Sequence, residues 1–383
     1  MKIGIVTYWN SGNNYGEQLQ NYALQEYLRG QGHEPFLIRY DYMNDTIYGS
    51  RPLPVRLLRA CNPRRLARFF RSRKDNRDRA ADAALHPRGF EGFREKNLSM
   101  SRVYGSIDEL RADPPEADMY ITGSDQVWNT YGGSLSEMRH RLMAFMLDFG
   151  GEDVLRVSYA ASFGRTSVPD DEKELVSPLL ARFDAVSVRE KTAIPICGSL
   201  GREDAVLALD PVLLHGADVY RRLYAESGFT KPQSKYLFFY DLYDGTGYDR
   251  QAVFDYAASK GLEVVYVTTG WHDAFERSFP SVPGWLALID NAEAVVTNSY
   301  HCSIISVLFE KRFGVIRRLG GYEGMNTRMD SLFELLGTEP RYIRDKDFSC
   351  LELPAVRTGS GLCEGICRPE ELFEAAKAKR ASK

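Results

Sequence analysis

Short apolar runs alternate along the chain with segments whose apolar residues recur at helical spacing. The first run spans residues 2–8, a polar loop covers 10–16, and the helical spacing then extends over 18–30. A short apolar run between polar segments is typical of a strand buried on both faces, and the spacing that follows it is typical of an amphipathic helix. With a second run at 35–40, this stretch predicts a strand–helix–strand unit with a right-handed crossover.

The same alternation continues in two series, separated by a seam at residues 215–234. We therefore predict an α/β fold of two doubly wound Rossmann-like domains, residues 1–215 and residues 216–383, the second ending in a C-terminal tail. Because such sheets bind ligands at the carboxyl ends of their strands, we expect a cleft between the domains. The remaining predicted strands are 118–122, 154–161, 185–189, 236–240, 263–268, 294–297 and 313–316, and the remaining predicted helices are 171–182, 249–260, 285–291, 303–310 and 326–336.

Residues 51–97 interrupt the alternation and form a predicted helical insertion in the first domain. Its first part, residues 51–79, holds eleven basic and two acidic residues, with apolar residues interleaved. Basic amphipathic segments of this kind bind anionic membrane surfaces, which predicts a peripheral membrane contact through 51–79. The alternative is a solvated insertion whose apolar face packs on the first domain.

The bulk properties narrow the class of protein. The formal net charge of the 383 residues is −3, so no overall positive field favours nucleic acid. No apolar stretch is long enough for a transmembrane helix, and the first apolar run is too short for a signal peptide. We therefore expect a cytoplasmic protein, placed at the inner face of the membrane if residues 51–79 bind there.

Six cysteines are scattered along the chain, which is not the dense spacing of a secreted disulfide framework. Cys363 and Cys367 are four positions apart, without a second pair or a nearby histidine. A structural zinc site is one reading of this pair, and reduced thiols are the expected one. We also find no carboxylate cluster suited to a metal ion and expect no metal site and no cofactor.

Small polar residues follow the predicted strand 294–297 and precede an apolar helix. Asn298 and Ser299, with the backbone amides of a helix N-terminus, suit an anion, and His301 at this place is able to donate a proton. The alternative is a helix cap beside a hydrogen-bonded histidine.

Two arginines lie where a ligand anion is expected. Arg189 ends the strand 185–189, so it either grips a carboxylate or phosphate or pairs with Glu190 on the surface. Asn326 opens a predicted helix, and Arg328 lies in its first turn, against the dipole preference for acids there. Arg328 therefore either serves an anionic ligand or is an ordinary surface residue.

Polar residues after two other strands suit a neutral, hydroxylated ligand such as a sugar. The loop after the first strand carries Asn13, Asn14, Tyr15 and Gln18, a set that matches neither a dinucleotide-binding loop nor a P-loop. The strand 118–122 is followed in turn by three residues of interest. Asp125 is either a base or a helix cap, and Gln126 is a candidate ligand of the sugar. Trp128 either stacks on the sugar or fills the core.

Several sequence blocks together resemble the polysaccharide pyruvyl transferase family. They are NNYGEQLQNYALQEYL, YITGSDQVWN, VSYAASFG, SVRE, LDPVLL, VVTNSYHCSIISVLFEKRF and MNTRMDSLFELLG, and they run in the family's order. The resemblance implies an architecture like that of the two-domain glycosyltransferase-B enzymes. It also implies a reaction in which the enolpyruvyl group of phosphoenolpyruvate, a co-substrate, is placed as a ketal on a sugar of a surface polysaccharide or on a lipid-linked oligosaccharide.

The resemblance also implies roles for individual residues. His301 matches the family's general acid, and Arg189 matches an arginine that binds the donor anion. Some members carry a second arginine where this chain has Ser299, which indicates the subtype with a Ser-aromatic-His motif. We take Arg328 as the replacement cation, with Arg317 and Arg318 in reserve. The donor set is then Arg189 of the first domain with Asn298, Ser299, Asn326 and Arg328 of the second, the expected donor side. The acceptor set, on the first domain as the expected acceptor side, is Asn13, Asn14, Tyr15, Gln18, Asp125 and Gln126.

Two other functions are compatible with the same architecture. One is a glycosyltransferase that uses a nucleotide sugar, and this requires a site for a base and a ribose in the second domain. The other is a non-catalytic protein of a glycan-assembly complex. The sequence shows no obvious site for a base and a ribose, and grouping of His301, Arg189 and Arg328 at one cleft would argue against the non-catalytic protein.

Overall fold

The computed structural model describes residues 1–43, 45, 77–130, 135–225, 227–242, 247–270, 274–319, 326–357 and 366–382. Most of the basic segment 51–79 therefore lies outside the described residues, and its predicted membrane contact stays a prediction. Cys363 also lies outside them, so the zinc reading of the Cys363–Cys367 pair is not tested. Among the described helices, none is long and apolar enough to span a membrane.

A seven-stranded, wholly parallel sheet forms the first domain. Its order is β3-β2-β1-β4-β5-β6-β7, so the chain starts in the middle and winds outward in both directions. In the central pairings, Ile5 lies opposite both Leu37 and Ile121, which builds a continuous apolar layer. The strands are β1 (Lys2–Val6), β2 (Glu34–Tyr40), β3 (Met100–Tyr104), β4 (Met119–Thr122), β5 (Leu155–Ala161), β6 (Ala185–Val188) and β7 (Val206–Leu207).

Helices cover both faces of this sheet. The central one, α1 (Tyr15–Gly30), begins at the carboxyl end of β1 and buries Leu19, Ala23, Leu24 and Leu28. The other helices of the domain are α5 (Phe90–Asn97), α6 (Ile107–Ala112), α7 (Leu135–Phe145), α8 (Asp170–Leu180) and α9 (Ala193–Ser199), and the short 3₁₀ helix η1 (Pro211–Leu214) leads out of it.

A second parallel sheet, of five strands in the order β12-β11-β10-β8-β9, forms the other half. Its strands are β8 (Tyr236–Asp241), β9 (Glu263–Thr268), β10 (Ala294–Thr297), β11 (Phe313–Ile316) and β12 (Tyr342–Ile343). Its helices are α10 (Ala217–Ala225), α11 (Gln251–Ser259), α12 (Val282–Asp290), α13 (Tyr300–Leu308) and α14 (Asn326–Leu335), with the 3₁₀ turn η3 (Ser349–Leu351). The two parallel sheets with helices on their faces confirm the predicted fold class.

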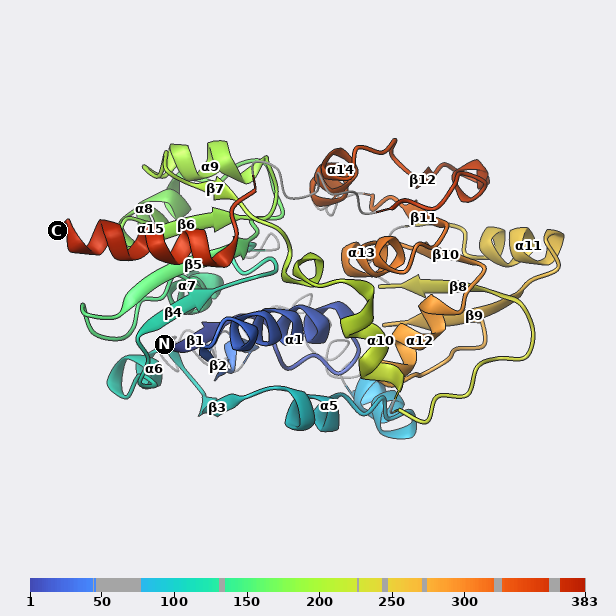
Figure 1. The fold of residues 1–383 in the computed structure, drawn as a ribbon, viewed down its shortest axis with the longest axis horizontal. Helices are drawn as coiled ribbons and strands as arrows, with labels where there is room; N and C mark the ends of the chain where they lie inside the picture. The colour runs from blue at the N-terminus through green and yellow to red at the C-terminus, as the bar shows by residue number, and fades with distance from the viewer. Residues whose placement is uncertain are drawn as a thin grey trace, which may run out of the picture.

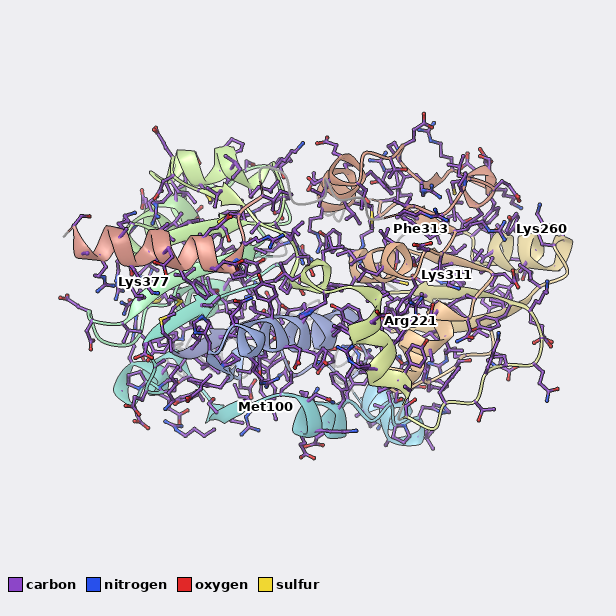
Figure 2. All side chains as sticks on the ribbon, viewed as in Figure 1. Met100, Arg221, Lys260, Lys311, Phe313 and Lys377 are labelled. Atoms are coloured by element: carbon purple, nitrogen blue, oxygen red, sulfur yellow. The ribbon has the colours of Figure 1, made fainter. Side chains whose placement is uncertain are left out.

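The C-terminal helix α15 (Pro369–Ala381) returns to the first domain. Leu372, Phe373 and Ala376 are buried in one cluster with residues of β1, α1 and β5, and Arg380 pairs with Asp184 at the start of β6. Figure 1 shows this red helix beside β5 and β6, far from the second sheet. In Figure 2, Lys377 on α15 and Lys260 at the end of α11 lie toward opposite ends of the molecule. The assignment of the C-terminal tail to the second domain is therefore wrong.

The two halves share a continuous apolar core through α1. The ring of Tyr15 stacks on Trp285 of α12 at 5.2 Å and meets Tyr240 of β8 edge-on. The end of the predicted insertion also reaches the second half, because Asp82 pairs with Arg277 at 2.7 Å. The insertion is thus not confined to the first domain.

Candidate functional site

The candidate site lies at the carboxyl ends of both sheets, where the halves meet. The first half contributes Asp125 after β4, Arg189 after β6 and Asp210 after β7. The second half contributes His301 from the start of α13 and Arg328 from the start of α14. All five side chains are buried, so the structure brings the three predicted residues His301, Arg189 and Arg328 together with two carboxylates.

Local capping places His301 at the base of α13. Ser299 is the N-cap residue, and its hydroxyl accepts a hydrogen bond from the amide of Cys302, so the side chain two positions after the cap points into the site. Nε2 of His301 lies 3.4 Å from Oδ2 of Asp210, within ion-pair distance. The geometry does not form a hydrogen bond there, and Nε2 has no hydrogen-bond partner among the described residues. His301 and Asp210 therefore form an ion pair when the imidazole is protonated.

Arg189 joins two carboxylates of its own domain. Its Nη1 donates to Asp210 at 2.7 Å, and its Nη2 donates to Asp125 at 3.1 Å. Its guanidinium lies 4.7 Å from the centre of the Tyr300 ring. Glu190 instead accepts hydrogen bonds from Ser162 and from the backbone amides of 163 and 164, so the alternative of an Arg189–Glu190 surface pair is wrong.

Arg328 is the less compensated of the two cations. Its Nη1 lies 3.8 Å from Asp125, beyond a hydrogen bond, and its Nε has no partner among the described residues. When the side-chain amide of Gln126 is oriented with its oxygen toward Arg328, that oxygen accepts hydrogen bonds from Nη1 at 3.2 Å and from Nη2 at 3.0 Å. The side chain is only 6% exposed, so the reading of Arg328 as a surface residue is wrong.

The pKa shifts follow from this burial and charge pattern. Burial and the charge of Arg189 lower the pKa of Arg328 to about 10, so Arg328 stays charged at neutral pH. Burial by itself raises the pKa of Asp125, but Arg189, His301 and Arg328 together hold it below its ordinary value. The same competition between burial and the charges of His301 and Arg189 leaves the pKa of Asp210 below its ordinary value. Both carboxylates are therefore ionised, and the site is a compact set of alternating charges.

The other predicted donor ligands support local structure. The amide of Asn298 accepts from Leu242 N and donates to Asp241, and Ser299 caps α13. The side-chain amide of Asn326 accepts a hydrogen bond from the backbone N–H of Arg318 and donates one to the carbonyl of the same residue. These three residues hold the loops that carry His301 and Arg328, and their direct contact with the donor stays a prediction.

The two reserve cations differ in their placement. Arg318 is buried, and its guanidinium donates to the carbonyl of Asn298, beside the site. Arg317 is half exposed, stacks on Tyr342 and lies 3.9 Å from Asp330. Arg317 therefore faces away from the site, and Arg328 is the better placed candidate.

The predicted acceptor residues separate into two groups. Asn13 and Asn14 are half-buried at the start of α1, and Asn13 donates to the carbonyl of Thr269 in the second half. Tyr15 and Gln18 are fully buried: the Tyr15 hydroxyl donates to the carbonyl of Pro280, and the Gln18 amide donates to that of Trp9. The prediction of direct acceptor contact is therefore wrong for Tyr15 and Gln18, whose side chains fix the loop.

Asp125 and Gln126 belong to the charged cluster, with Arg189 and Arg328 respectively. Trp128 is a core residue, because it is fully buried and its indole N–H donates to the carbonyl of Phe145. Among the described residues, no group of three or more histidine, cysteine or acidic side chains is arranged to hold a metal ion.

Sequence reasoning missed Asp210, Tyr300 and Gly16. Asp210 follows a short strand, and its position at a strand end inside the block LDPVLL was a usable signal. Tyr300 offers its ring face to Arg189 and, at 5.6 Å, to Arg328. Gly16 has no signal of its own in the sequence, because its importance comes from a close approach of His301 that only folding creates.

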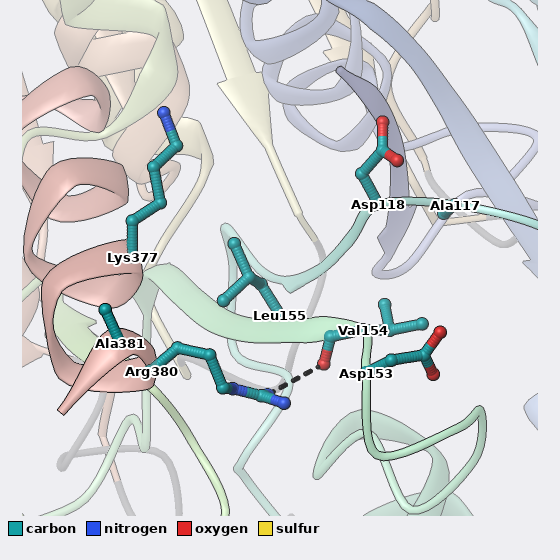
Figure 3. A pocket seen from close by; sticks show the side chains of 8 residues that line it. All are labelled: Ala117, Asp118, Asp153, Val154, Leu155, Lys377, Arg380 and Ala381. Atoms are coloured by element: carbon teal, nitrogen blue, oxygen red, sulfur yellow. Dashed lines mark hydrogen bonds between the residues drawn. The ribbon is translucent and has the colours of Figure 1, made fainter. Parts of the chain in front are cut away.

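A separate pocket of about 400 Å³ opens at the amino edge of the first sheet. Figure 3 shows Lys377 and Arg380 of α15 on one side of it and Asp118 and Asp153 on the other, with Arg380 donating to the carbonyl of Val154. Ligands of parallel sheets bind at the carboxyl ends of the strands, so this pocket is not the candidate site.

Comparison with solved structures finds epimerases and glycosyltransferases among the similar folds. The S. aureus protein MnaA, in a co-structure with UDP, is 13% identical, with 98% of this chain and 91% of that chain covered and a TM-score of 0.44. The UDP-GlcNAc 2-epimerase of Neisseria meningitidis is 9% identical, with 100% and 99% covered and a TM-score of 0.43. The glycosyltransferase SnogD of Streptomyces nogalater is 13% identical, with 100% and 94% covered and a TM-score of 0.36.

No curated protein matches the sequence significantly. The sequence model of one family, described as polysaccharide pyruvyl transferase, matches residues 14–318, a span that contains His301, Arg189 and Asp210 but begins after Asn13 and ends before Arg328. That span covers most of the chain and includes α1 and the strands from β2 to β11. The chain therefore belongs to the polysaccharide pyruvyl transferase family.

Proposed function

We propose that this protein transfers the enolpyruvyl group of phosphoenolpyruvate to a sugar, forms a cyclic ketal and releases phosphate. The observation that carries the proposal is the convergence of His301 and Arg328 from one half on Asp125, Arg189 and Asp210 from the other. An acid, a poorly compensated cation and fixed carboxylates in one buried place suit a reaction in which positive charge develops on carbon.

Arg328 is the proposed first contact of the donor anion. Its Nη1 lies 3.8 Å from Asp125, too far for a hydrogen bond, and a buried cation without full compensation favours a ligand carboxylate or phosphate. Arg189 has both terminal nitrogens occupied by Asp125 and Asp210. We therefore assign Arg189 the role of holding the two carboxylates, beside the ring of Tyr300. This role replaces the expected one of direct donor ligand.

His301 is the proposed general acid. Protonation of the donor's methylene carbon gives an oxocarbenium-like centre at C2, which an acceptor hydroxyl attacks. The C2–O bond to phosphate then breaks, and a second hydroxyl of the sugar closes the ketal. Ionised Asp125 and Asp210 lie close enough to His301 to stabilise the positive charge that forms in this sequence.

The loop before α1 is the proposed acceptor side. Asn13 and Asn14 are half-buried, lie next to the site and offer amide groups suited to sugar hydroxyls. The acceptor class is a sugar of a surface polysaccharide or of its lipid-linked precursor. With phosphoenolpyruvate as the donor and no cofactor or metal in the scheme, we place the reaction in the cytoplasm.

The test is an incubation of the protein with phosphoenolpyruvate and a panel of sugars, read by phosphate release and by mass. Each product should gain about 70 Da, the net mass of a pyruvyl ketal. His301→Ala should lose about 10²–10⁴-fold in rate, whereas His33→Ala, near the amino terminus and away from the site, should not. Binding of a nucleotide sugar without any reaction of phosphoenolpyruvate would instead indicate a glycosyltransferase and overturn the proposal.

A further inference from the structure

Asp210 lies where the chain leaves the first sheet, and its carboxylate meets both halves of the site. Oδ1 accepts the amide of Val212 at 3.0 Å and so begins η1. Oδ2 accepts from Arg189 at 2.7 Å and faces Nε2 of His301 at 3.4 Å. The side chain is fully buried, so this carboxylate has no freedom to turn away from the imidazole.

The opposite edge of the His301 ring packs on α1. A Cβ atom added to Gly16 would lie 2.6 Å from Cγ and 2.7 Å from Cβ of His301, and nearer still to Nδ1. The ring is therefore fixed from two sides, with Nε2 toward Asp210 and Nδ1 toward the start of α1, where the half-buried loop residues Asn13 and Asn14 lie. Among the described residues, no acceptor reaches Nδ1.

We propose that Asp210 is the positioning residue of the general acid: it holds Nε2 of His301, so that the ring delivers its proton from Nδ1 toward the substrates at the start of α1. The assignment of His301 as the acid rests on the proposed function, but the orientation and the tautomer of the ring do not. After transfer, the neutral ring keeps its remaining proton on Nε2, next to the carboxylate, and Nδ1 is left as the acceptor.

The charges around the ring favour this arrangement. Asp210 and Asp125 both interact favourably with a protonated His301, while Arg189 and Arg328, on β6 and α14, act against it. Glu17, beside Gly16 on α1, is held protonated at neutral pH because burial raises its pKa to about 8, so it adds little charge. Asp210 is the nearest of the carboxylates, and it therefore decides which nitrogen keeps the proton.

The experiment is a ¹⁵N NMR titration of the histidines in the intact protein, with His301 assigned by its absence in His301→Gln. In the wild type, the neutral His301 ring should be the Nε2–H tautomer. In Asp210→Asn, the preference for the Nε2–H tautomer should weaken, because an ionised neighbour is lost while the amide keeps the shape. The control is Asp184→Asn, a buried carboxylate at the other edge of the sheet that pairs with Arg380 and should leave His301 unchanged.

A neutral wild-type ring protonated on Nδ1 would overturn the proposal, and so would an unchanged tautomer population in Asp210→Asn. If Asp210→Asn does not fold, the wild-type tautomer alone decides the question. The NMR result needs no phosphoenolpyruvate, so a failure of the proposed function and a failure of this inference are separate outcomes.

Discussion

At the residue scale, Gly16 is the point of closest approach between α1 and the proposed acid. Any side chain here would meet the Cβ atom and ring of His301 at less than 3 Å, and a Cβ atom is not a flexible end that is able to move aside. The absence of a side chain at position 16 is therefore a requirement of the site and not of the helix.

We expect Gly16→Ala to displace His301 and to lower the rate of transfer by about 10²-fold, since a shift of about 1 Å in a catalytic group has this effect. Gly30→Ala is the matched control, because a Cβ atom at the last residue of the same helix meets nothing within 4 Å. Rates are compared by phosphate release. A Gly16→Ala enzyme that turns over at the wild-type rate would contradict this account of the site.

The two arginines of the site should respond differently to removal. Arg328→Gln should weaken donor binding by about 10- to 100-fold, because one charge-assisted contact of roughly 1.5–3 kcal/mol is lost, while the fold is kept. Arg189→Gln should mainly destabilise the protein, by about 3–5 kcal/mol, because Asp125 and Asp210 are left without their buried partner.

Calorimetry with phosphoenolpyruvate and chemical denaturation measure these two effects separately. Arg317→Gln serves as the control for Arg328, because its guanidinium stacks on Tyr342 away from the site. Unchanged donor affinity in Arg328→Gln would remove Arg328 from the donor site. Unchanged stability in Arg189→Gln would show that the carboxylates do not depend on it.

At the element scale, α13 and α15 show two ways in which a helix is tied to a site. All residues of α13 are buried, so the whole surface of the helix is packed against its surroundings. The backbone that carries His301 is therefore held in place. Helix α15 is amphipathic instead, with Leu372, Phe373 and Ala376 in the first domain's core and lysines outside. The first domain is thus completed by residues from the far end of the chain.

Phe373→Ala should therefore destabilise the first domain by about 3–5 kcal/mol, the usual cost of deleting a buried phenylalanine side chain. Lys377→Ala, on the exposed side of the same helix, should change the free energy of unfolding little. Urea unfolding followed by circular dichroism gives both values. Equal stability in the two variants would mean that α15 is not part of the domain's core.

At the scale of the whole molecule, the two halves are joined by more than their crossover. Tyr15 of the first half forms one aromatic cluster with Trp285 and Tyr240 of the second half. Asp82 of the insertion also pairs with Arg277 of the second half. Figure 1 shows α1 between the two sheets, with α12 beside its start. Because the charged site needs residues from both halves, this shared core is what keeps Asp210 opposite His301.

The membrane contact predicted for residues 51–79 also belongs to this scale, because it would place the whole enzyme at a surface. The protein should sediment with anionic vesicles at low salt and be released as salt screens the charges. A variant with Arg64, Arg65, Arg68 and Arg71 changed to glutamate should stay in the supernatant. If the wild type also stays there, the segment is only an insertion.

The sequence by itself determined most of the buried strands and the strand ends where chemistry gathers. Continuous apolar runs must be buried on both faces, so β1, β2, β4, β5, β6, β8, β9, β10 and β11 were readable from pattern alone. Strand β3 was not, because three of its middle residues are half or fully exposed and it lies at the sheet edge. Strand β12 was not predicted either, because two residues are too few to show a hydrophobic pattern.

Only the tertiary structure decided which side chains of different elements pair with each other. A pattern along the chain fixes which face of an element is apolar, but it does not say which carboxylate will face which cation from another element. Hence His301, Arg189 and Arg328 were found as candidates, whereas the occupation of Arg189 by Asp125 and Asp210 appeared only after folding. The burial of Tyr15 and Gln18, the return of α15 and the need for Gly16 arise in the same way, from contacts between residues far apart in sequence.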